Sequence, residues 1–254
     1  MEFEGKVVII TGASSGIGAQ TAKDFSKLNA NVVLVGRNAE NLKAIAAECT
    51  AADKTLIVQA DVNLDDDCKK IINETINKWG RIDVLVNSAG IIETGSIENT
   101  SIEQYDRVMN TNMRSIYLLT MLAVPYLVAT QGNIVNVSSV NGIRSFAGVL
   151  AYNLSKACVD QFTRCTALEL AAKNVRVNSV NPGVIITNIH KRGGMNDETY
   201  AAFLERSKTT HPLGRPGTVD EVSEVITFLA SSKASFITGA QVPIDGGRHA
   251  TCLR

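Results

Sequence analysis

The sequence predicts a doubly wound α/β fold, in which a mostly seven-stranded parallel sheet is covered by helices on both faces. Short runs rich in Val and Ile alternate with helical patterns along the whole chain, which favours one parallel sheet with crossover helices. The first run, 6–11, passes directly into a glycine-rich loop and a helix. A chain of 254 residues has the length of one α/β unit, so we expect a single domain spanning 1–254.

Local residue types indicate each element in turn. β-branched and other apolar residues fill the strands expected at 6–11, 31–35, 55–59, 83–87, 132–139, 176–180 and 241–244. Helical patterns fill the helices expected at about 16–27, 39–48, 65–79, 102–129, 152–173 and 218–230. Pro125 predicts a kink in the long 102–129 helix, and Thr218 with Glu221 forms a capping box for the last one. A loop is expected at 140–151.

The segment 187–216 is expected to be an irregular, mobile flap over an apolar cleft. Glycines and prolines interrupt it at 193, 194, 212, 214 and 216. Its apolar residues are Ile189, Met195, Tyr200, Phe203 and Leu204. Segments of this kind commonly close over a bound ligand.

Composition excludes several classes of function. Lys plus Arg number 25 and Asp plus Glu number 25, so no basic field predicts nucleic-acid binding. The longest nearly apolar run, 116–129, is too short to span a bilayer, and the first residues lack the layout of a signal peptide. The scattered cysteines and histidines predict neither disulfides nor a metal site; they are Cys49, Cys68, Cys158, Cys165, Cys252, His190, His211 and His249. We expect a cytoplasmic protein.

The loop after the first strand predicts a nucleotide-binding site. Gly12, Gly16 and Gly18 follow the spacing G-x-x-x-G-x-G between a strand and a helix, where the backbone can approach a pyrophosphate. A plain strand-to-helix turn is the alternative, but the surrounding strand and helix favour a dinucleotide. The second strand ends in Gly36 and Arg37 with no acid. Arg37 is either a solvated cation at a helix start or, as we prefer, a clamp on the 2′-phosphate of NADP(H).

Three further positions are open to more than one interpretation. Asp61 ends the third strand, where it either caps the next helix or accepts a hydrogen bond from an adenine amine. The turn from Asn87 to Gly90 follows the fourth strand and would lie under the cofactor. Asn112 is a poor residue for a helix interior, and an isolated Asn there is usually solvated or locally bonded.

Tyr152 and Lys156 are the candidate acid/base pair. Four residues apart on a helix, they lie on one face, and a nearby ammonium is expected to lower the phenol pKa. Ser139 ends a buried strand, so its hydroxyl would emerge at the edge where parallel sheets bind ligands. Taken alone, a Tyr and a Lys at this spacing are usually a surface pair. Together with Ser139, they predict a site that protonates or deprotonates an oxygen.

With these pieces in place, nearly the whole sequence resembles the short-chain dehydrogenase/reductase family, which has a Rossmann-type fold. The matching motifs are T-G-x-x-x-G-x-G at 11–18, N-S-A-G at 87–90, Y-x-x-x-K at 152–156 with Ser139, N-P-G at 181–183 through Thr187, 237–239 and 245–247. Ser88 replaces the usual second Asn of the 87–90 turn, which is a mild departure. Asn112 falls where the family has its fourth catalytic residue.

The resemblance implies hydride transfer between a nicotinamide and a carbonyl or secondary alcohol. It implies that Tyr152 is the general acid or base, that Lys156 lowers the Tyr152 pKa and holds the nicotinamide ribose, and that Ser139 steadies the substrate oxygen. Asn112 would hold a water that relays protons to Lys156. Family members are mostly homotetramers or homodimers, and an Arg at the position of Arg37 goes with NADP(H). Because Ser15 is not basic, NAD(H) is also possible.

The expected cofactor-binding residues come from the loops at one edge of the sheet. They are Gly12, Ser14, Ser15, Gly16, Ile17, Gly18, Arg37, Asn38, Asp61, Val62, Asn87, Ala89, Gly90, Tyr152, Lys156, Pro182, Gly183, Ile185 and Thr187.

The substrate is expected to be a small apolar ketone or alcohol, steroid-like or terpenoid-like rather than a sugar. Ile143, Phe146 and Leu150 indicate an apolar cleft, to which Glu93 or Asn141 would add one polar contact. Two alternatives stay open: an NAD-dependent alcohol dehydrogenase, and a non-catalytic NADP(H)-binding sensor on the same scaffold.

Overall fold

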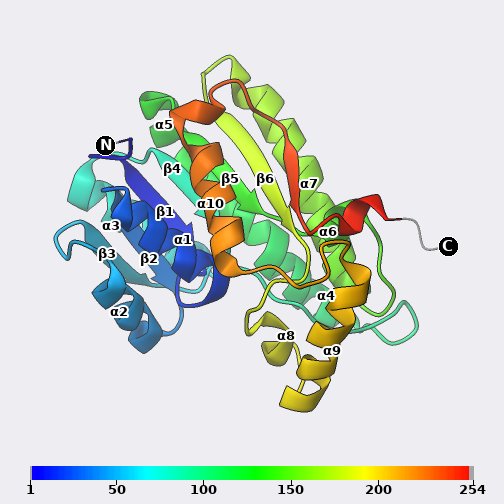
Figure 1. The fold of residues 1–254 in the computed structure, drawn as a ribbon. Coiled ribbons are helices and arrows are strands. Elements are labelled where there is room, and N and C mark those ends of the chain that lie inside the picture. The colour runs from blue at the N-terminus through cyan, green and yellow to red at the C-terminus, as the bar shows by residue number, and fades with distance from the viewer. Residues whose placement is uncertain (1, 252–254) are drawn as a thin grey trace.

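The computed structural model describes residues 2–251, in which seven strands form one sheet with all neighbouring pairs parallel (Figure 1). The strand order is β3-β2-β1-β4-β5-β6-β7. The strands are β1 (Val7–Thr11), β2 (Asn31–Gly36), β3 (Thr55–Gln59), β4 (Val84–Asn87), β5 (Asn133–Val137), β6 (Arg176–Pro182) and β7 (Gln241–Ile244). This confirms the predicted doubly wound seven-stranded fold. Because β1 lies between β2 and β4, the strand order reverses there, and ligands bind at such a point.

Helices cover both faces of the sheet. They are α1 (Gly16–Lys27), α2 (Ala39–Glu48), α3 (Asp65–Trp79), α4 (Ile102–Met109), α5 (Ser115–Thr130), α6 (Val140–Ile143), α7 (Leu150–Ala171), α8 (Ile189–Arg192), α9 (Asp197–Thr210) and α10 (Val219–Ala230). Short 3-10 turns follow at η2 (Ser232–Ala234) and η3 (Arg248–Ala250). Buried side chains of α1, α2 and α10 pack on one face, and those of α3, α5 and α7 pack on the other.

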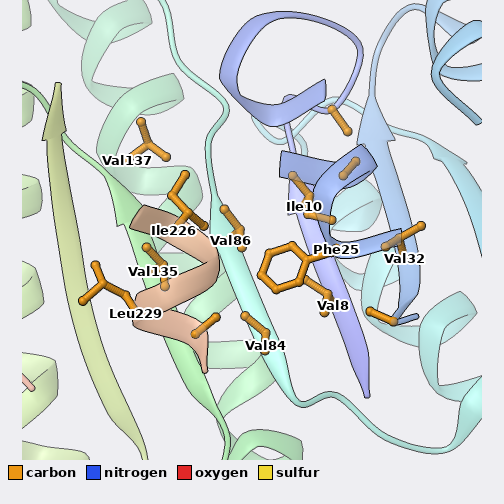
Figure 2. Close-up of a cluster of buried hydrophobic side chains, with 14 of the residues drawn as sticks. Val8, Ile10, Phe25, Val32, Val84, Val86, Val135, Val137, Ile226 and Leu229 are labelled. Carbon is orange, nitrogen blue, oxygen red and sulfur yellow. The ribbon is translucent and has the colours of Figure 1, made fainter. Parts of the chain in front are cut away.

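Alternate residues of each strand supply two cores. Val8 and Ile10 point toward α1 and α10, whereas Val7 and Ile9 point toward the opposite layer. Figure 2 shows Phe25 of α1 within the first of these cores, beside Val8 of β1 and the β4 valines. The two-sided burial explains why the strands are nearly continuous apolar runs rather than alternating ones.

Most predicted boundaries agree with the structure, and three regions differ. The expected irregular flap contains α8 and the well-formed α9, because Asn196 accepts a hydrogen bond from the Thr199 amide and caps α9. The expected loop at 140–151 contains α6, where Ser139 caps the short helix. The long fourth helix departs from α geometry at a π-helical turn, Asn110–Arg114, while α5 runs through Pro125.

One helical run among the described residues, Ile102–Thr130, is long and apolar enough to cross a membrane by length and composition alone. Its α5 part instead contacts α3 and β4, and it places Leu119, Ala123 and Leu127 in the core. It therefore packs as a layer helix of the sheet.

The described part of the chain contains free cysteines and no cluster of metal-binding side chains. Cys49, Cys68, Cys158 and Cys165 are free thiols, and Cys252 lies outside the described residues. Residues 2–251 contain no group of three or more His, Cys, Asp or Glu side chains that could hold a metal ion.

Candidate active site

A cleft of about 610 Å³ lies at the carboxyl edge of the sheet, where all seven strands end. Most predicted site residues line it: Gly12, Ser14, Ser15, Gly16, Ile17, Gly18, Arg37, Asp61, Val62, Ala89, Gly90, Ser139, Tyr152, Lys156, Pro182, Gly183, Ile185 and Thr187. Three do not. Asn38 caps α2, because its side-chain oxygen accepts a hydrogen bond from the Asn41 backbone amide. Asn87 is buried, and its side-chain amide donates a hydrogen bond to the Asn136 side-chain oxygen. Asn112 is buried as well.

The glycine loop is shaped for close backbone approach. Gly12 has φ +68° and packs so tightly that a Cβ there would lie 3.0 Å from the Ser88 and Ala89 backbone. A Cβ on Gly18 would lie 2.6 Å from the Gly12 carbonyl oxygen, so this position also requires glycine. Ser15 precedes α1 without capping it by its side chain, and the first turn of α1 carries no acid. The helix end is therefore open to an anion such as a pyrophosphate.

Arg37 and Asp61 face each other across the ends of β2 and β3. The Arg37 guanidinium lies 3.8 Å from the Asp61 carboxylate, and both side chains retain solvent exposure. Asp61 accepts hydrogen bonds from the backbone and side chain of Asn63, whereas Leu64 is the residue at the α3 N-cap. The helix-cap interpretation of Asp61 is therefore wrong, and the adenine contact stays a prediction.

Arg192 is a residue of this region that the sequence analysis missed. It lies at the end of α8 and lines the same cleft as Arg37. Burial lowers the pKa of Arg192, and the positive charge of Arg37 lowers it further. Two guanidiniums thus lie within electrostatic reach of each other at the end of the cleft next to β2. No local pattern signals this, because the contact depends on how the flap folds over the sheet.

Ser139, Tyr152 and Lys156 converge in the middle of the cleft. Tyr152 and Lys156 lie on one face of α7, and the Lys156 Nζ lies 5.6 Å from the Tyr152 ring centroid and donates to the Val137 carbonyl at 2.8 Å. The Ser139 hydroxyl accepts from the Asn141 amide at 3.1 Å. Burial places all three side chains in a site where electrostatic interactions are strong. The interpretation as an ordinary surface pair is wrong.

The pKa of Tyr152 differs from the expected direction. Burial raises the pKa of the Tyr152 phenol to about 12, and the hydrogen bond with Ser139 opposes this rise only in part. Burial also lowers the pKa of Lys156 to about 8, opposed by the Asp160 carboxylate. The predicted lowering of the Tyr152 pKa is therefore wrong for the chain's own groups, because desolvation outweighs the opposing contribution from Ser139.

The π-helical turn explains the position of Asn112. Its amide donates to the Ile91 carbonyl at 2.9 Å and to the Ser155 hydroxyl at 3.0 Å, while its oxygen accepts from the Ile91 amide at 2.8 Å. A Cβ on Gly90 would lie 3.4 Å from the Asn112 Oδ1 and 3.7 Å from the Lys156 Nζ. Asn112 is thus locally bonded and not solvated, and Gly90 leaves space between it and Lys156.

Asp160 is a second residue that the sequence analysis missed. It lies one helical turn after Lys156, is buried, and accepts hydrogen bonds from the Asn181 amide at 3.0 and 2.9 Å. The same amide donates to the Ser139 backbone carbonyl at 2.9 Å. Burial raises the pKa of Asp160, while Ser138, Asn181 and Lys156 oppose the rise. Its spacing of four from Lys156 was the available signal.

The end of the cleft next to β5, β6 and β7 combines aromatic and cationic side chains. Phe146, Ile189, Met195 and Phe203 line it as apolar residues, whereas Tyr200, Leu204, Ile143, Leu150 and Glu93 do not line the cleft. Asn141 does. His190, Arg206 and Arg248 also line this end, and the sequence analysis missed all three.

Known proteins resemble this chain over almost its whole length. The family described as enoyl-(acyl carrier protein) reductase matches residues 12–249. The chain is 39% identical to the 3-oxoacyl-[acyl-carrier-protein] reductase FabG of Thermotoga maritima, over 97% of this chain and 99% of that protein. It is 38% identical to the meso-2,3-butanediol dehydrogenase of Serratia marcescens, over 99% and 97% of the two chains. The chain belongs to the short-chain dehydrogenase/reductase family.

Solved structures agree with this assignment. A Caenorhabditis elegans short-chain dehydrogenase/reductase of unknown function, solved with cofactor, superposes with a TM-score of 0.94 at 36% identity and covers 99% of this chain and 98% of its own. The Brucella melitensis 3-ketoacyl-(acyl-carrier-protein) reductase, complexed with NADH, superposes with a TM-score of 0.89 at 32% identity. This match covers 97% of this chain and 99% of the Brucella chain. This short-chain dehydrogenase/reductase is accordingly an oxidoreductase for CH–OH or C=O groups with a nicotinamide dinucleotide cofactor.

The lowered pKa of Lys156 predicts how stability depends on pH. Between about pH 8 and the ordinary lysine pKa of 10.5, the unfolded chain binds a proton at this side chain and the folded chain releases it. Stability should therefore rise with pH across this window, and below it the buried ammonium costs about 3 kcal/mol. We expect Lys156→Met to raise the free energy of unfolding by about 1–3 kcal/mol near neutral pH, with a smaller gain at about pH 10.

Urea unfolding of both proteins at the two pH values measures this difference. Lys43→Met, which removes an exposed lysine paired with Glu40 on α2, is the matched control and should change stability little at either pH. A Lys156→Met effect of equal size at both pH values would contradict the prediction.

Proposed function

We propose that this protein reduces a carbonyl group with NADPH, or oxidises the matching secondary alcohol with NADP⁺, as one dinucleotide-binding and catalytic unit spanning the chain. The observation that carries the proposal is the convergence of the buried side chains of Ser139, Tyr152 and Lys156 in one cleft that the uncapped start of α1 also lines. A bound nicotinamide supplies or accepts the hydride. The chain's own residues bind and orient the cofactor and the substrate, and they exchange the proton with the substrate oxygen.

Tyr152 is the proposed proton donor in reduction. Its raised pKa keeps the phenol protonated at neutral pH, so its Oη can give a proton to the substrate oxygen as that oxygen gains negative charge. The Ser139 hydroxyl, which lines the same cleft as Tyr152, would hold the same oxygen. Giving up this proton leaves a phenolate, which the Lys156 ammonium stabilises, and in the oxidative direction that phenolate takes the proton from the alcohol.

Lys156 and Asn112 are proposed to restore the proton. The Lys156 Nζ faces Gly90 and Asn112, and its pKa of about 8 lets it release a proton near neutral pH. Asn112 has its amide and oxygen engaged with Ile91 and Ser155, which holds the π-helical turn open beside the ammonium. A water in this position would connect Lys156 to solvent.

The preference for NADP(H) rests on the charges at the end of β2. Arg37 and Arg192 bring two guanidiniums to this end of the cleft, and Asp61 supplies one carboxylate. A 2′-phosphate would be held by both cations. NAD(H) is the alternative, because the loop residue Ser15 adds no charge and Asp61 already neutralises part of Arg37.

The proposed substrate is a small carbonyl or alcohol with an apolar body, bound under a flap formed by residues 187–216. Phe146, Met195 and Phe203 give it an apolar surface. Its relatives are named for carbonyl or alcohol chemistry, which supports an enzyme over a sensor. They include a 3-oxoacyl reductase, a butanediol dehydrogenase and the L-xylulose reductase of Caenorhabditis elegans. Its free thiols suit the reducing cytoplasm, where we place it.

Tyr152→Phe tests the catalytic role. The variant keeps the ring but loses the proton donor, so NADPH turnover with a ketone panel should fall by about 10²–10⁴-fold, while NADPH binding, followed by its fluorescence, stays intact. Tyr105→Phe changes a tyrosine outside the cleft and should leave turnover unchanged. A fully active Tyr152→Phe enzyme would sink the proposal, and NADPH binding without turnover in the wild type would favour the sensor.

Arg37→Gln tests the cofactor preference. Loss of a charged hydrogen-bonding partner should raise the Kd for NADPH by about tenfold to a hundredfold, with little change for NADH, and Arg192→Gln should act in the same direction. Lys43→Gln removes a cation of α2 outside the cleft and serves as the control. Equal losses for NADPH and NADH would refute a role at the 2′-phosphate.

Self-association is proposed through α5 and α7. Leu154 and Leu168 lie on one stripe of α7 and are exposed, and Phe162 contacts the exposed Tyr117 of α5 with ring centroids 5.9 Å apart. Met121 extends this apolar face, which is suited to a homotetramer or homodimer.

We expect Leu168→Asp to lower the sedimentation coefficient toward that of the monomer, because it places a charge on this apolar face. Leu64→Asp, at the exposed N-cap of α3, is the control and should leave the sedimentation coefficient unchanged. A wild type that sediments as a monomer would overturn this.

A further inference from the structure

We infer that the substrate carries an anionic group, a carboxylate or a phosphate, which Arg206 and Arg248 bind at the end of the cleft next to β7. The inference deepens the proposed function and rests on it. It replaces a wholly apolar ketone by a carbonyl compound with an apolar body and a charged end.

Arg206 and Arg248 come from separate parts of the chain and lie close enough for the charge of one to act on the other. Arg206 belongs to α9 of the flap and Arg248 begins η3, which contacts α6 and lies beside it as the red segment of Figure 1. Both line the cleft. Because β7 and β2 lie on opposite sides of the strand order, these cations are separated from the Arg37 end, where the adenosine is expected.

The position of Arg248 is coupled to the reacting centre. Its guanidinium stacks over the Phe146 ring at 4.3 Å from the centroid. The Phe146 carbonyl accepts from the Asn153 amide at 2.7 Å, and the Asn153 oxygen accepts from the Asn141 amide at 2.7 Å. Asn141 in turn donates its backbone N–H to the Ser139 hydroxyl at 3.1 Å. A short chain of contacts therefore joins the cation to Ser139.

The backbone that carries Arg248 is anchored on both sides. The Asp245 carboxylate accepts from the Gly247 amide at 3.1 Å and from the His249 amide at 2.6 Å, and it also pairs with the His249 ring at 3.0 Å. The Arg144 Nε donates to the His249 carbonyl at 2.7 Å. Arg248 is thus presented by a fixed turn, as a preorganised binding group requires.

The two guanidiniums have no acidic partner in the described structure. Several other arginines have one: Arg107 pairs with Glu93 at 2.9 Å, and Arg215 pairs with Glu221 at 2.6 Å. Within residues 2–251, neither Arg206 nor Arg248 makes an ion pair or a side-chain hydrogen bond.

Their environment favours an added anion. Burial and the charge of Arg206 lower the pKa of Arg248, and an anion placed between the two would offset the repulsion between their charges. Among residues 2–251, Asp245 is the acid whose charge acts on Arg248, and its carboxylate already accepts hydrogen bonds from the η3 turn.

Neighbouring side chains define the rest of this site. His190 packs on Phe203 with ring centroids 4.5 Å apart, and burial together with the charge of Arg248 lowers its pKa. A neutral imidazole there offers a hydrogen bond without adding charge. Phe146 and Met195 line the cleft as apolar, half-buried side chains, Arg248 is half-buried and Arg206 is exposed. A guanidinium can make a charge-assisted, bidentate contact with a carboxylate or a phosphate.

The test compares charged and neutral forms of the same carbonyl compounds. Oxo acids with different spacings between ketone and carboxylate are measured beside their methyl esters, and oxoalkyl phosphates beside their neutral dimethyl esters, with NADPH as reductant. We expect at least one acid or phosphate to have a kcat/KM about tenfold or more above that of its ester. Whether the preferred compound is an acid or a phosphate identifies the anion.

Arg206→Gln and Arg248→Gln then assign the preference. Each should lower kcat/KM for the preferred anion by about tenfold to a hundredfold, mainly through KM, while kcat/KM for the neutral ester and the Kd for NADPH stay unchanged. Lys208→Gln removes a cation of α9 that pairs with Glu205 outside the cleft, so it is the matched control and should change none of these values.

The remaining outcomes separate this inference from the proposed function. Equal rates for anions and esters, or variants that weaken NADPH binding or both substrate forms alike, would overturn the inference and leave the reductase standing. Where no compound is reduced, binding of the acids and phosphates to the NADPH-loaded protein decides. Binding lost in Arg206→Gln supports the anion site while the reductase proposal fails, and absence of binding overturns the anion site.

Discussion

The parallel direction of all seven strands is the constraint on which the site depends. Because every strand ends at the same edge, the loops after β1, β2, β4, β5 and β6 meet in one cleft although they are far apart in sequence. The sheet is covered on both faces, so this edge is where polar side chains such as Ser139 can emerge from a buried strand. The glycines of the first loop then admit a ligand to within contact distance of the backbone.

A buried ammonium is the costly element of this arrangement. Lys156 is buried in the cleft, and this desolvation lowers its pKa. Its hydrogen bond to the Val137 carbonyl compensates only part of the free-energy cost of burying the ammonium. Asp160, one turn further along α7, supplies an opposite charge and at the same time holds Asn181 against the Ser139 carbonyl. Asp160 therefore both offsets the charge of Lys156 and, through Asn181, positions Ser139, which would contact the substrate oxygen.

The sequence was sufficient for features that depend on local signals. The helices at 39–48 and 65–79 have the predicted bounds, since Asn38 caps one and Gly80 ends the other in a left-handed conformation. The helix α9 was missed, although Asn196 was a usable cap signal between two interruptions. The direction of the Tyr152 pKa shift, and the meeting of Arg206 with Arg248, depend on tertiary burial and on the path of the flap. No spacing in the sequence encodes either.

The charges along the cleft suggest how a substrate would be oriented. Arg37 and Arg192 lie at one end, Lys156 in the middle, and Arg206 with Arg248 at the other, whereas the acids nearby are engaged by Asn63 or by the η3 turn. On the proposed function, the two outer pairs would hold two different anions, one on the cofactor and one on the substrate. Anchoring both molecules at their far ends would place the reacting atoms between them beside Tyr152, so that positioning adds to proton transfer. An apolar substrate would lack the contact at its far end, so only Ser139 and the apolar lining of the cleft would set the distance of its carbonyl from the phenol.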